Sequence, residues 1–307
     1  RKFDLVLSAA LCCAVLTSCG GSPSPTPSPT PTPTGSGTPT PTPSATPIVF
    51  DFTKAFSLST GGIYIYANFT PTGGTEVFSD ASRISGLSGL AYEIAPEKVV
   101  FGFPDLTTDP QYLASERTTT TATQRIYTRD ATSLRLDKPF TNLIRATYMR
   151  TDPFTRSGVA GTLRGYRVGV FSIPVTITTV IASNLTYTGT ASVVGGTLGT
   201  TVPGAITSTA TTFTIVPAAS ATTTPTISGT IRVLETVGAT TTEKAVLAFA
   251  GTVGTNGAIS GAITDTPNAF TGAFSGVLAG PNREELAIVF SASHADGRKY
   301  VGDLLAD

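Results

Sequence analysis

Few side chains in this sequence have the types and spacing that chemistry requires. His294 is the single histidine, and it stands in a Ser-His-Ala-Asp-Gly run just before an expected turn. A lone imidazole cannot build a multi-histidine metal cage, so we interpret His294 as a solvated residue rather than a metal or haem ligand. No Gly-x-Ser-x-Gly elbow accompanies the serines, which disfavours Ser/His/Asp nucleophilic catalysis. We expect no enzyme activity, no metal and no cofactor.

Two further groups of side chains have a possible role. Glu284 and Glu285 are adjacent. On a strand they point to opposite faces, so they cannot flank one substrate atom, and we expect a solvated strand start. Tyrosine is enriched at interfaces, so the tyrosines could form a recognition surface or simply pack in the sheets. The tyrosines in question are Tyr64, Tyr66, Tyr127, Tyr148, Tyr166 and Tyr187.

The charge balance argues against a nucleic-acid partner. The 307 residues include 20 Lys and Arg and 20 Asp and Glu, so the formal net charge is zero. Binding a phosphate backbone needs a basic face, and this chain has no basic cluster. No apolar stretch reaches the roughly 18 residues of a membrane-spanning helix.

The first residues have the pattern of an export signal. Arg1 and Lys2 precede an apolar run from Leu5 to Leu16 that only Ser8 interrupts. A basic start followed by about a dozen apolar residues is typical of a secretory signal peptide.

The end of this run, Leu16-Thr17-Ser18-Cys19-Gly20, resembles a bacterial lipobox. The resemblance implies a signal peptide over 1–18 and acyl chains on Cys19, which would hold the protein on a lipid bilayer. Gly20 at the next position implies the outer membrane. The alternative is an ordinary cleaved signal in which Cys19 has no role.

Residues 19–47 read as a disordered tether. Ten of the 22 prolines lie between Pro23 and Pro47, where they alternate mostly with Thr and Ser. Such a composition cannot bury enough apolar surface to fold. It favours extended polyproline II at about 3.1 Å per residue, which suits a spacer.

From Ile48 onward the sequence predicts an all-β protein, because β-branched and aromatic residues dominate. The alternation of Phe270, Gly272, Phe274, Gly276 and Leu278 places large residues and glycines on one face, as in the tapered interior of a small barrel. Similar runs lie at 185–189, 212–216, 227–233, 245–253, 258–264, 286–291 and 299–303. With turn signals between them, they predict an eight-stranded antiparallel up-and-down β-barrel over 166–307.

Residues 48–165 are less regular and carry most of the charge. Strand-like runs occur at 63–66, 99–103, 125–128, 133–136 and 144–148. They predict a small β-rich, handle-like region, with a boundary near 157–165.

The predicted closing hairpin resembles that of transferrin-binding protein B-like surface lipoproteins. Gly280, Pro281, Glu285 and Phe290 fall at the spacings usual in that family. Arg283, Ala287 and Ile288 depart from it, because Ala and a pair of Gly are usual there. The resemblance implies an anchor peptide, a handle-like domain and an eight-stranded barrel, with binding of host proteins at the cell surface. It transfers no binding residues.

These observations favour a monomeric outer-membrane lipoprotein that binds an extracellular partner without catalysis. An iron- or haem-carrying protein is one candidate partner. The alternatives are a barrel that holds a small apolar or haem-like ligand and a purely structural envelope lipoprotein. A small-molecule binder needs a hollow barrel. Phe270, Phe274, Leu278, Ile288 and Phe290 predict a filled one.

Overall fold

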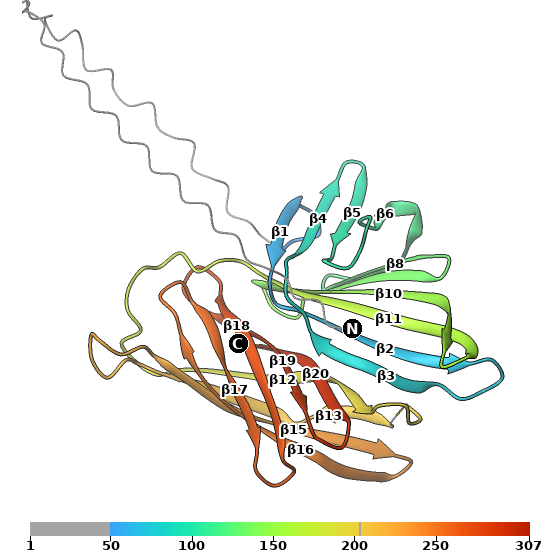
Figure 1. The fold of residues 1–307 in the computed structure, drawn as a ribbon. Coiled ribbons are helices and arrows are strands. Elements are labelled where there is room, and N and C mark those ends of the chain that lie inside the picture. Colours follow the sequence, from blue (N-terminus) through green and yellow to red (C-terminus); the bar gives the residue numbers. More distant parts are fainter. Residues whose placement is uncertain (1–49, 203) are drawn as a thin grey trace, which may run out of the picture. The chain divides into compact units, whose positions relative to one another are not determined.

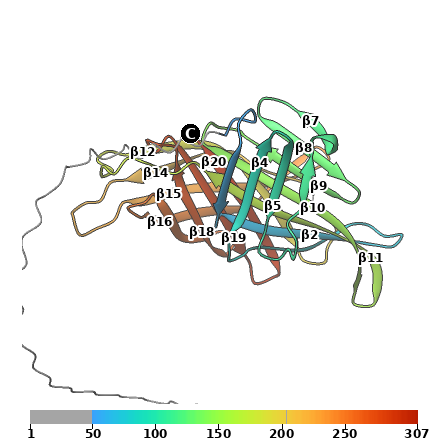
Figure 2. The same cartoon turned by 90° about the horizontal axis from the view of Figure 1, so that it is seen from above.

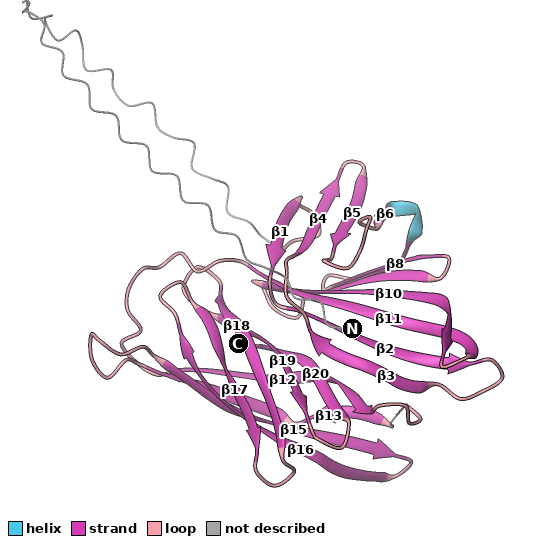
Figure 3. Cartoon of the chain, in the orientation of Figure 1, coloured by secondary structure: helices cyan, strands magenta, loops and turns pink. Residues whose placement is uncertain are grey.

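The computed structural model describes residues 50–202 and 204–307. The expected signal peptide 1–18, the expected acylation site Cys19 and the tether 19–47 lie outside the described residues. Strands make up the regular structure, apart from one short 3₁₀ turn, η1 (Ala114–Glu116) (Figure 3). No helix that could span a bilayer occurs among the described residues.

Residues 56–172 form two antiparallel sheets, which we call the handle (Figure 1). The larger sheet has the order β3-β2-β11-β10-β9-β8-β7, and the smaller has the order β1-β4-β5-β6. The strands are β1 (Phe56–Thr60), β2 (Ile63–Pro71), β3 (Val77–Arg83), β4 (Ser88–Ile94), β5 (Glu97–Gly102), β6 (Gln111–Leu113), β7 (Arg117–Thr120), β8 (Gln124–Arg129), β9 (Thr132–Asp137), β10 (Leu143–Arg156) and β11 (Val159–Ser172). All five strand-like runs expected in this region lie within or overlap these strands.

The two handle sheets share one aromatic core. Phe56 and Tyr92 of the smaller sheet stack with ring centroids 5.4 Å apart. Leu134, Ile144 and Phe171 of the larger sheet belong to the same buried cluster. Alternate residues on β9 and β10 therefore face the smaller sheet, which leaves the other set on the opposite face.

The remaining strands close into a barrel. They are β12 (Leu185–Thr197), β13 (Ala205–Ser208), β14 (Ala210–Val216), β15 (Thr226–Val237), β16 (Thr240–Val253), β17 (Ala258–Asp265), β18 (Phe270–Ala279), β19 (Glu285–Ser293) and β20 (Arg298–Ala306). Antiparallel pairs connect β12 to β20 and then β19, β18, β17 and β16 in turn. The β16–β15, β15–β14 and β14–β12 pairs close the ring of eight strands, and short β13 pairs with β15 outside it. Strands on opposite sides of the barrel cross at an angle, because strands in a closed barrel are tilted to its axis (Figure 2). The predicted eight-stranded antiparallel barrel is confirmed.

The start of the barrel differs from the expected domain boundary. Strand β11 runs through Tyr166 to Ser172, and it pairs with β10 and β2 of the handle. The first barrel strand begins at Leu185. The handle therefore extends past residue 165, and a linker joins it to the barrel.

Side chains fill the barrel interior. The ring of Phe249 lies 5.3, 5.0 and 5.4 Å from those of Phe213, Phe274 and Phe290. Glycine makes room for them, because a Cβ on Gly261 would stand 2.5 Å from the Phe274 ring. The five residues expected to point inward, Phe270, Phe274, Leu278, Ile288 and Phe290, are all buried in this cluster. The prediction of a filled barrel is therefore confirmed for these positions.

The Phe274→Ala variant should lose about 3–5 kcal/mol of stability, because it removes a ring from a close-packed interior and leaves a cavity. Urea unfolding followed by circular dichroism measures the change. Thr271→Ala is the control, since Thr271 is exposed on the outer face of the same strand, and it should change stability by no more than about 0.5 kcal/mol. Equal effects of the two substitutions would contradict the filled interior.

Candidate binding groove between the handle and the barrel

The outer wall of the barrel packs against the larger handle sheet. Val168 and Val170 of β11 share a buried cluster with Ala287 and Val289 of β19 and with Leu305 of β20. Strand β19 is therefore covered on both faces, with Ile288 and Phe290 inside the barrel. This explains why its sequence is apolar without interruption from Leu286 to Phe290.

A buried carboxylate joins the two parts at this contact. Asp303 of β20 is 1% exposed. Its Oδ2 accepts a hydrogen bond of 2.7 Å from the Tyr64 hydroxyl, and its Oδ1 accepts one of 3.3 Å from Nη1 of Arg145. Burial raises the pKa of Asp303, while Arg145 and the hydrogen bond from Tyr64 act in the opposite direction. Burial and the neighbouring Asp303 also raise the pKa of Tyr64, so its phenol stays protonated and donates.

A second buried carboxylate holds the end of the handle. Oxygens of Glu285 accept hydrogen bonds from the backbone N–H groups of Thr141 and Asn142 at 3.0 and 2.9 Å. The Asn142 side-chain amide donates to the same carboxylate at 3.0 Å. The expectation of a solvated Glu285 is wrong, because the handle covers it; burial raises its pKa. Glu284 points elsewhere, as expected, and binds Asn282 in its own turn.

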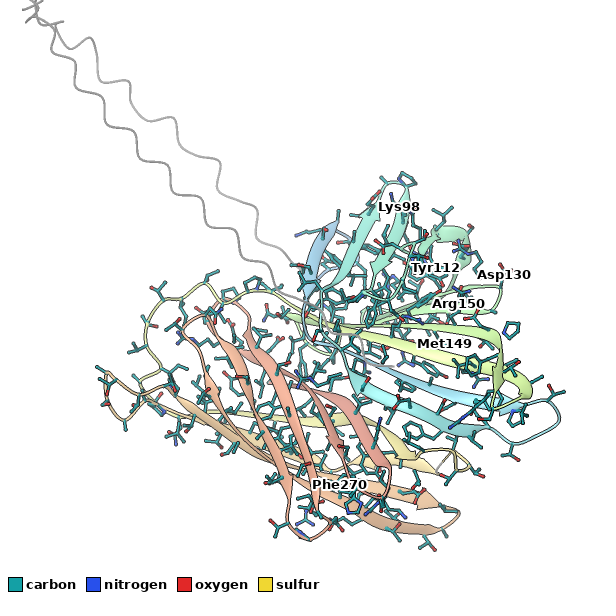
Figure 4. All side chains as sticks on the ribbon, in the orientation of Figure 1. Lys98, Tyr112, Asp130, Met149, Arg150 and Phe270 are labelled. Carbon is teal, nitrogen blue, oxygen red and sulfur yellow. The ribbon has the colours of Figure 1, made fainter. Side chains whose placement is uncertain are left out.

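Beside the apolar contact lies an open cavity of about 480 Å³, which we call the groove. One wall is the barrel-facing side of the handle sheet, and the other includes Ser192 and Val194 of β12. The handle side chains that line it are Tyr64, Tyr66, Ser133, Arg135, Asp137, Arg145, Thr147, Met149, Thr151, Arg164, Tyr166 and Val168. Neighbouring residues Met149 and Arg150 of β10 are labelled in Figure 4, and alternation places only Met149 in the groove.

The groove holds two tyrosines in a stack. The rings of Tyr66 and Tyr166 lie 4.3 Å apart and nearly parallel. Burial, followed by the neighbouring Tyr166, raises the pKa of Tyr66, so the phenol is neutral. The other four candidate tyrosines are buried: Tyr64, Tyr127, Tyr148 and Tyr187. Only the stacked pair therefore combines partial exposure with a place in the groove.

Three arginines supply the positive charge of the groove. Nε of Arg135 contacts both oxygens of Asp137 at 2.9 and 2.7 Å. Arg145 lies between Asp137, at 3.6 Å, and Asp303. Arg164 has a carboxylate oxygen of Glu76 at 3.4 Å. Neither Arg135 nor Arg164 was distinguished by its sequence context, although β9 alternates charged residues with Leu134 and Leu136.

His294 lies away from the groove, next to the β19–β20 turn. Its Nδ1 is 2.7 Å from Oδ1 of Asp296, and its ring lies 5.5 Å from that of Phe270. Across residues 50–202 and 204–307, no three His, Cys, Asp or Glu side chains gather as metal ligands. The surroundings of His294 are thus those of a turn residue that packs on an aromatic ring.

Comparisons with known proteins add a likeness of fold. No protein-family model matches the sequence, and the comparison with curated proteins gives no match. The fold is similar to that of the isotype 1 transferrin-binding protein B from serogroup B Neisseria meningitidis, at 13% identity and a TM-score of 0.43, over 80% of this chain and 43% of that one. The chain thus spans less than half the length of that protein.

Two further structures share this likeness. A protein described as a surface lipoprotein has 13% identity and a TM-score of 0.38, over 81% of this chain and 100% of that one. A transferrin-binding protein B variant from Actinobacillus pleuropneumoniae has 13% identity and a TM-score of 0.38, over 82% of this chain and 100% of that one. At this identity the likeness concerns the fold alone.

The Asp303→Ala variant should destabilise the protein by about 3 kcal/mol, because it leaves the largely buried Arg145 without its buried partner. Asp303→Asn should lose less, since the amide still offers an oxygen to Arg145. Urea unfolding measures both variants. Asp152→Ala removes an exposed ion pair with Arg150 and should cost no more than about 1 kcal/mol. If Asp303→Ala loses no more stability than Asp152→Ala, the buried contact of Asp303 with Tyr64 and Arg145 does not hold the handle on the barrel.

Proposed function

We propose that this protein is a surface-anchored lipoprotein that binds an extracellular protein partner in the groove, without catalysis. The observation that carries the proposal is the filled barrel, because it leaves the outer surface to receive a ligand. The groove offers there a partly exposed aromatic stack beside arginines, and tyrosine and arginine are the residues that most often dominate binding energy. The lipobox-like Cys19 and the Pro-rich segment support the anchoring part of the proposal.

The chemistry of the groove supports binding rather than catalysis. Its lining residues include no His, Cys or Lys that could act as a nucleophile or base near neutral pH. Its carboxylate, Asp137, contacts Arg135 and Arg145. Such paired charges give specificity and orientation to a contact surface.

Within the barrel itself, a small apolar ligand would bind at one end. A cavity of about 280 Å³ lies at one end of the barrel, and its lining includes Val180, Ile181, Val253 and Leu278. Drug-sized ligands usually occupy about 300–1,000 Å³. This cavity is thus at the lower limit, and the barrel interior is filled by side chains, so a barrel that holds a small ligand ranks second.

Affinity capture tests the binding function. The chain from Gly20 onward is immobilised and exposed to the fluid in which the organism lives, and retained proteins are identified by mass spectrometry. We expect wild type to retain a protein that Ser192→Trp loses, because Trp at this wall position fills the groove. Thr271→Trp, on the exposed outer face of β18, should retain it. A haem titration followed by absorbance runs in parallel. Retention of no protein, together with a clear absorbance shift, would reverse the ranking.

The anchoring part of the proposal has its own test. The intact mass of the native protein should exceed that of its polypeptide by the mass of acyl chains, and Cys19→Ala should remove this excess because it removes the acceptor sulfur. Cys13→Ala, inside the expected signal peptide, should leave the excess unchanged. A native mass that equals the bare polypeptide would contradict acylation.

A further inference from the structure

The strand register arranges the groove residues in rows across the handle sheet. Successive rows across β9, β10, β11 and β2 are Arg135, Thr147, Val168 and Tyr64; then Ser133, Met149, Tyr166 and Tyr66; then Thr151, Arg164 and Asn68. Apart from Ser133 at its β9 end, the middle row is apolar and aromatic. An exposed arginine stands in the row on each side of it.

The two arginines are the accessible charges of these rows. The side chains of Arg135 and Arg164 are 51% and 46% exposed, against 14% for Asp137 and 28% for Glu76. Arg135 uses Nε for Asp137, and neither of its terminal nitrogens makes a hydrogen bond to the residues that the structure describes. A ligand that enters the groove therefore meets guanidinium groups before it meets carboxylates.

The carboxylate of Asp137 has little capacity left for a ligand cation. It accepts from Arg135 and, at 2.8 Å, from the side-chain amide of Gln124, and it lies 3.6 Å from Arg145. Guanidinium groups with free terminal nitrogens bind carboxylates in a fork geometry. The charge of the groove thus favours an acidic ligand.

The spacing of the arginines indicates the length of that ligand. They are two strands and four residues apart in the register, which gives about 16 Å between their Cα atoms for strands about 4.8 Å apart and a rise of about 3.3 Å per residue. About five residues of extended chain span this distance. At this spacing a short peptide segment contacts both arginines more readily than a single small anion does.

We propose that the groove binds an extended acidic peptide segment of the partner protein, with one carboxylate on Arg135, another on Arg164 and an apolar side chain between them. The apolar side chain packs on Met149 and on the Tyr66–Tyr166 stack, where the thioether of Met149 adapts to its shape. This inference rests on the proposed binding function and names the chemistry of its partner.

The test uses the chain from Gly20 onward and a labelled peptide, Gly-Glu-Ser-Phe-Ser-Glu-Gly, in fluorescence anisotropy. Its two Glu and its Phe lie on the same face of an extended chain. A second peptide has Gln in place of both Glu. We expect the Glu peptide to bind at least tenfold more tightly, because each charge-assisted hydrogen bond is worth more than a neutral one. Arg135→Gln and Arg164→Gln should each weaken the Glu peptide about tenfold and leave the Gln peptide nearly unchanged.

Arg150→Gln is the matched control. Arg150 lies on the same sheet and is also 51% exposed, but it pairs with Asp152 on the face away from the groove. The Arg150→Gln variant should bind the Glu peptide as wild type does. The three Arg→Gln variants should all melt within a few degrees of wild type. Equal binding of the two peptides, or an equal loss in Arg150→Gln, would overturn the proposal.

Two further results separate this proposal from its alternatives. Dextran sulfate replaces the peptide in a parallel titration; if it binds through Arg135 and Arg164 and the Glu peptide does not, the ligand is a polyanion and the acidic-peptide proposal fails. The capture experiment is repeated with Arg135→Gln and Arg164→Gln. If both variants still retain the partner fully, the binding function stands but the acidic-peptide proposal is overturned. If wild type retains no partner, the binding function itself fails.

Discussion

The contact between the handle sheet and the outer wall of the barrel is the constraint on which the rest of the structure depends. Sheets of this kind are stable when their apolar faces are covered. Strands β19 and β20 carry apolar side chains on both faces, so the barrel alone would expose Ala287, Val289 and Leu305. The handle covers them, and Val168 and Val170 provide the complementary surface. The same contact sets the two walls of the groove against each other.

Polar groups fix the register of this contact, which apolar packing alone leaves loose. Asp303 requires its partners Tyr64 and Arg145, and Glu285 requires the backbone of Asn142. A slide of the handle over the barrel would leave both carboxylates buried without hydrogen bonds, at a cost of several kcal/mol. The buried carboxylates therefore select one arrangement of the walls, and with it one shape of the groove.

The sequence was sufficient for features that depend on neighbouring residues. Alternation in Phe270–Leu278 and the glycine turns predicted the barrel strands and their inward faces, because side-chain direction follows from period two alone. Gly257, Gly280 and Gly297 sit in those turns with φ of 78°, 82° and 93°, where other residues are strained.

The sequence could not show contacts between distant strands. Tyr64 and Arg145 meet Asp303 only through the packing of the handle on the barrel, so the residues next to Asp303 and Glu285 in the chain do not indicate their partners. The expected boundary between handle and barrel, near residue 165, falls inside β11 for the same reason. The composition of β11 is that of a barrel strand, and only its pairing with β2 and β10 assigns it to the handle. The groove forms between the larger handle sheet and β12 of the barrel, so no pattern in the neighbouring sequence marks its arginines as groove residues.

The pairing inside the groove bears on how well it can bind. A free arginine side chain loses about 2 kcal/mol of rotamer entropy when a ligand immobilises it. Arg135 has lost part of this freedom already, because Asp137 holds its Nε. Asp137 is in turn fixed by Gln124 and by the neighbouring Arg145. The acidic residues of the groove thus neutralise part of its charge but also orient the guanidinium of Arg135, and a preorganised donor binds a carboxylate at a lower entropic cost than a mobile one.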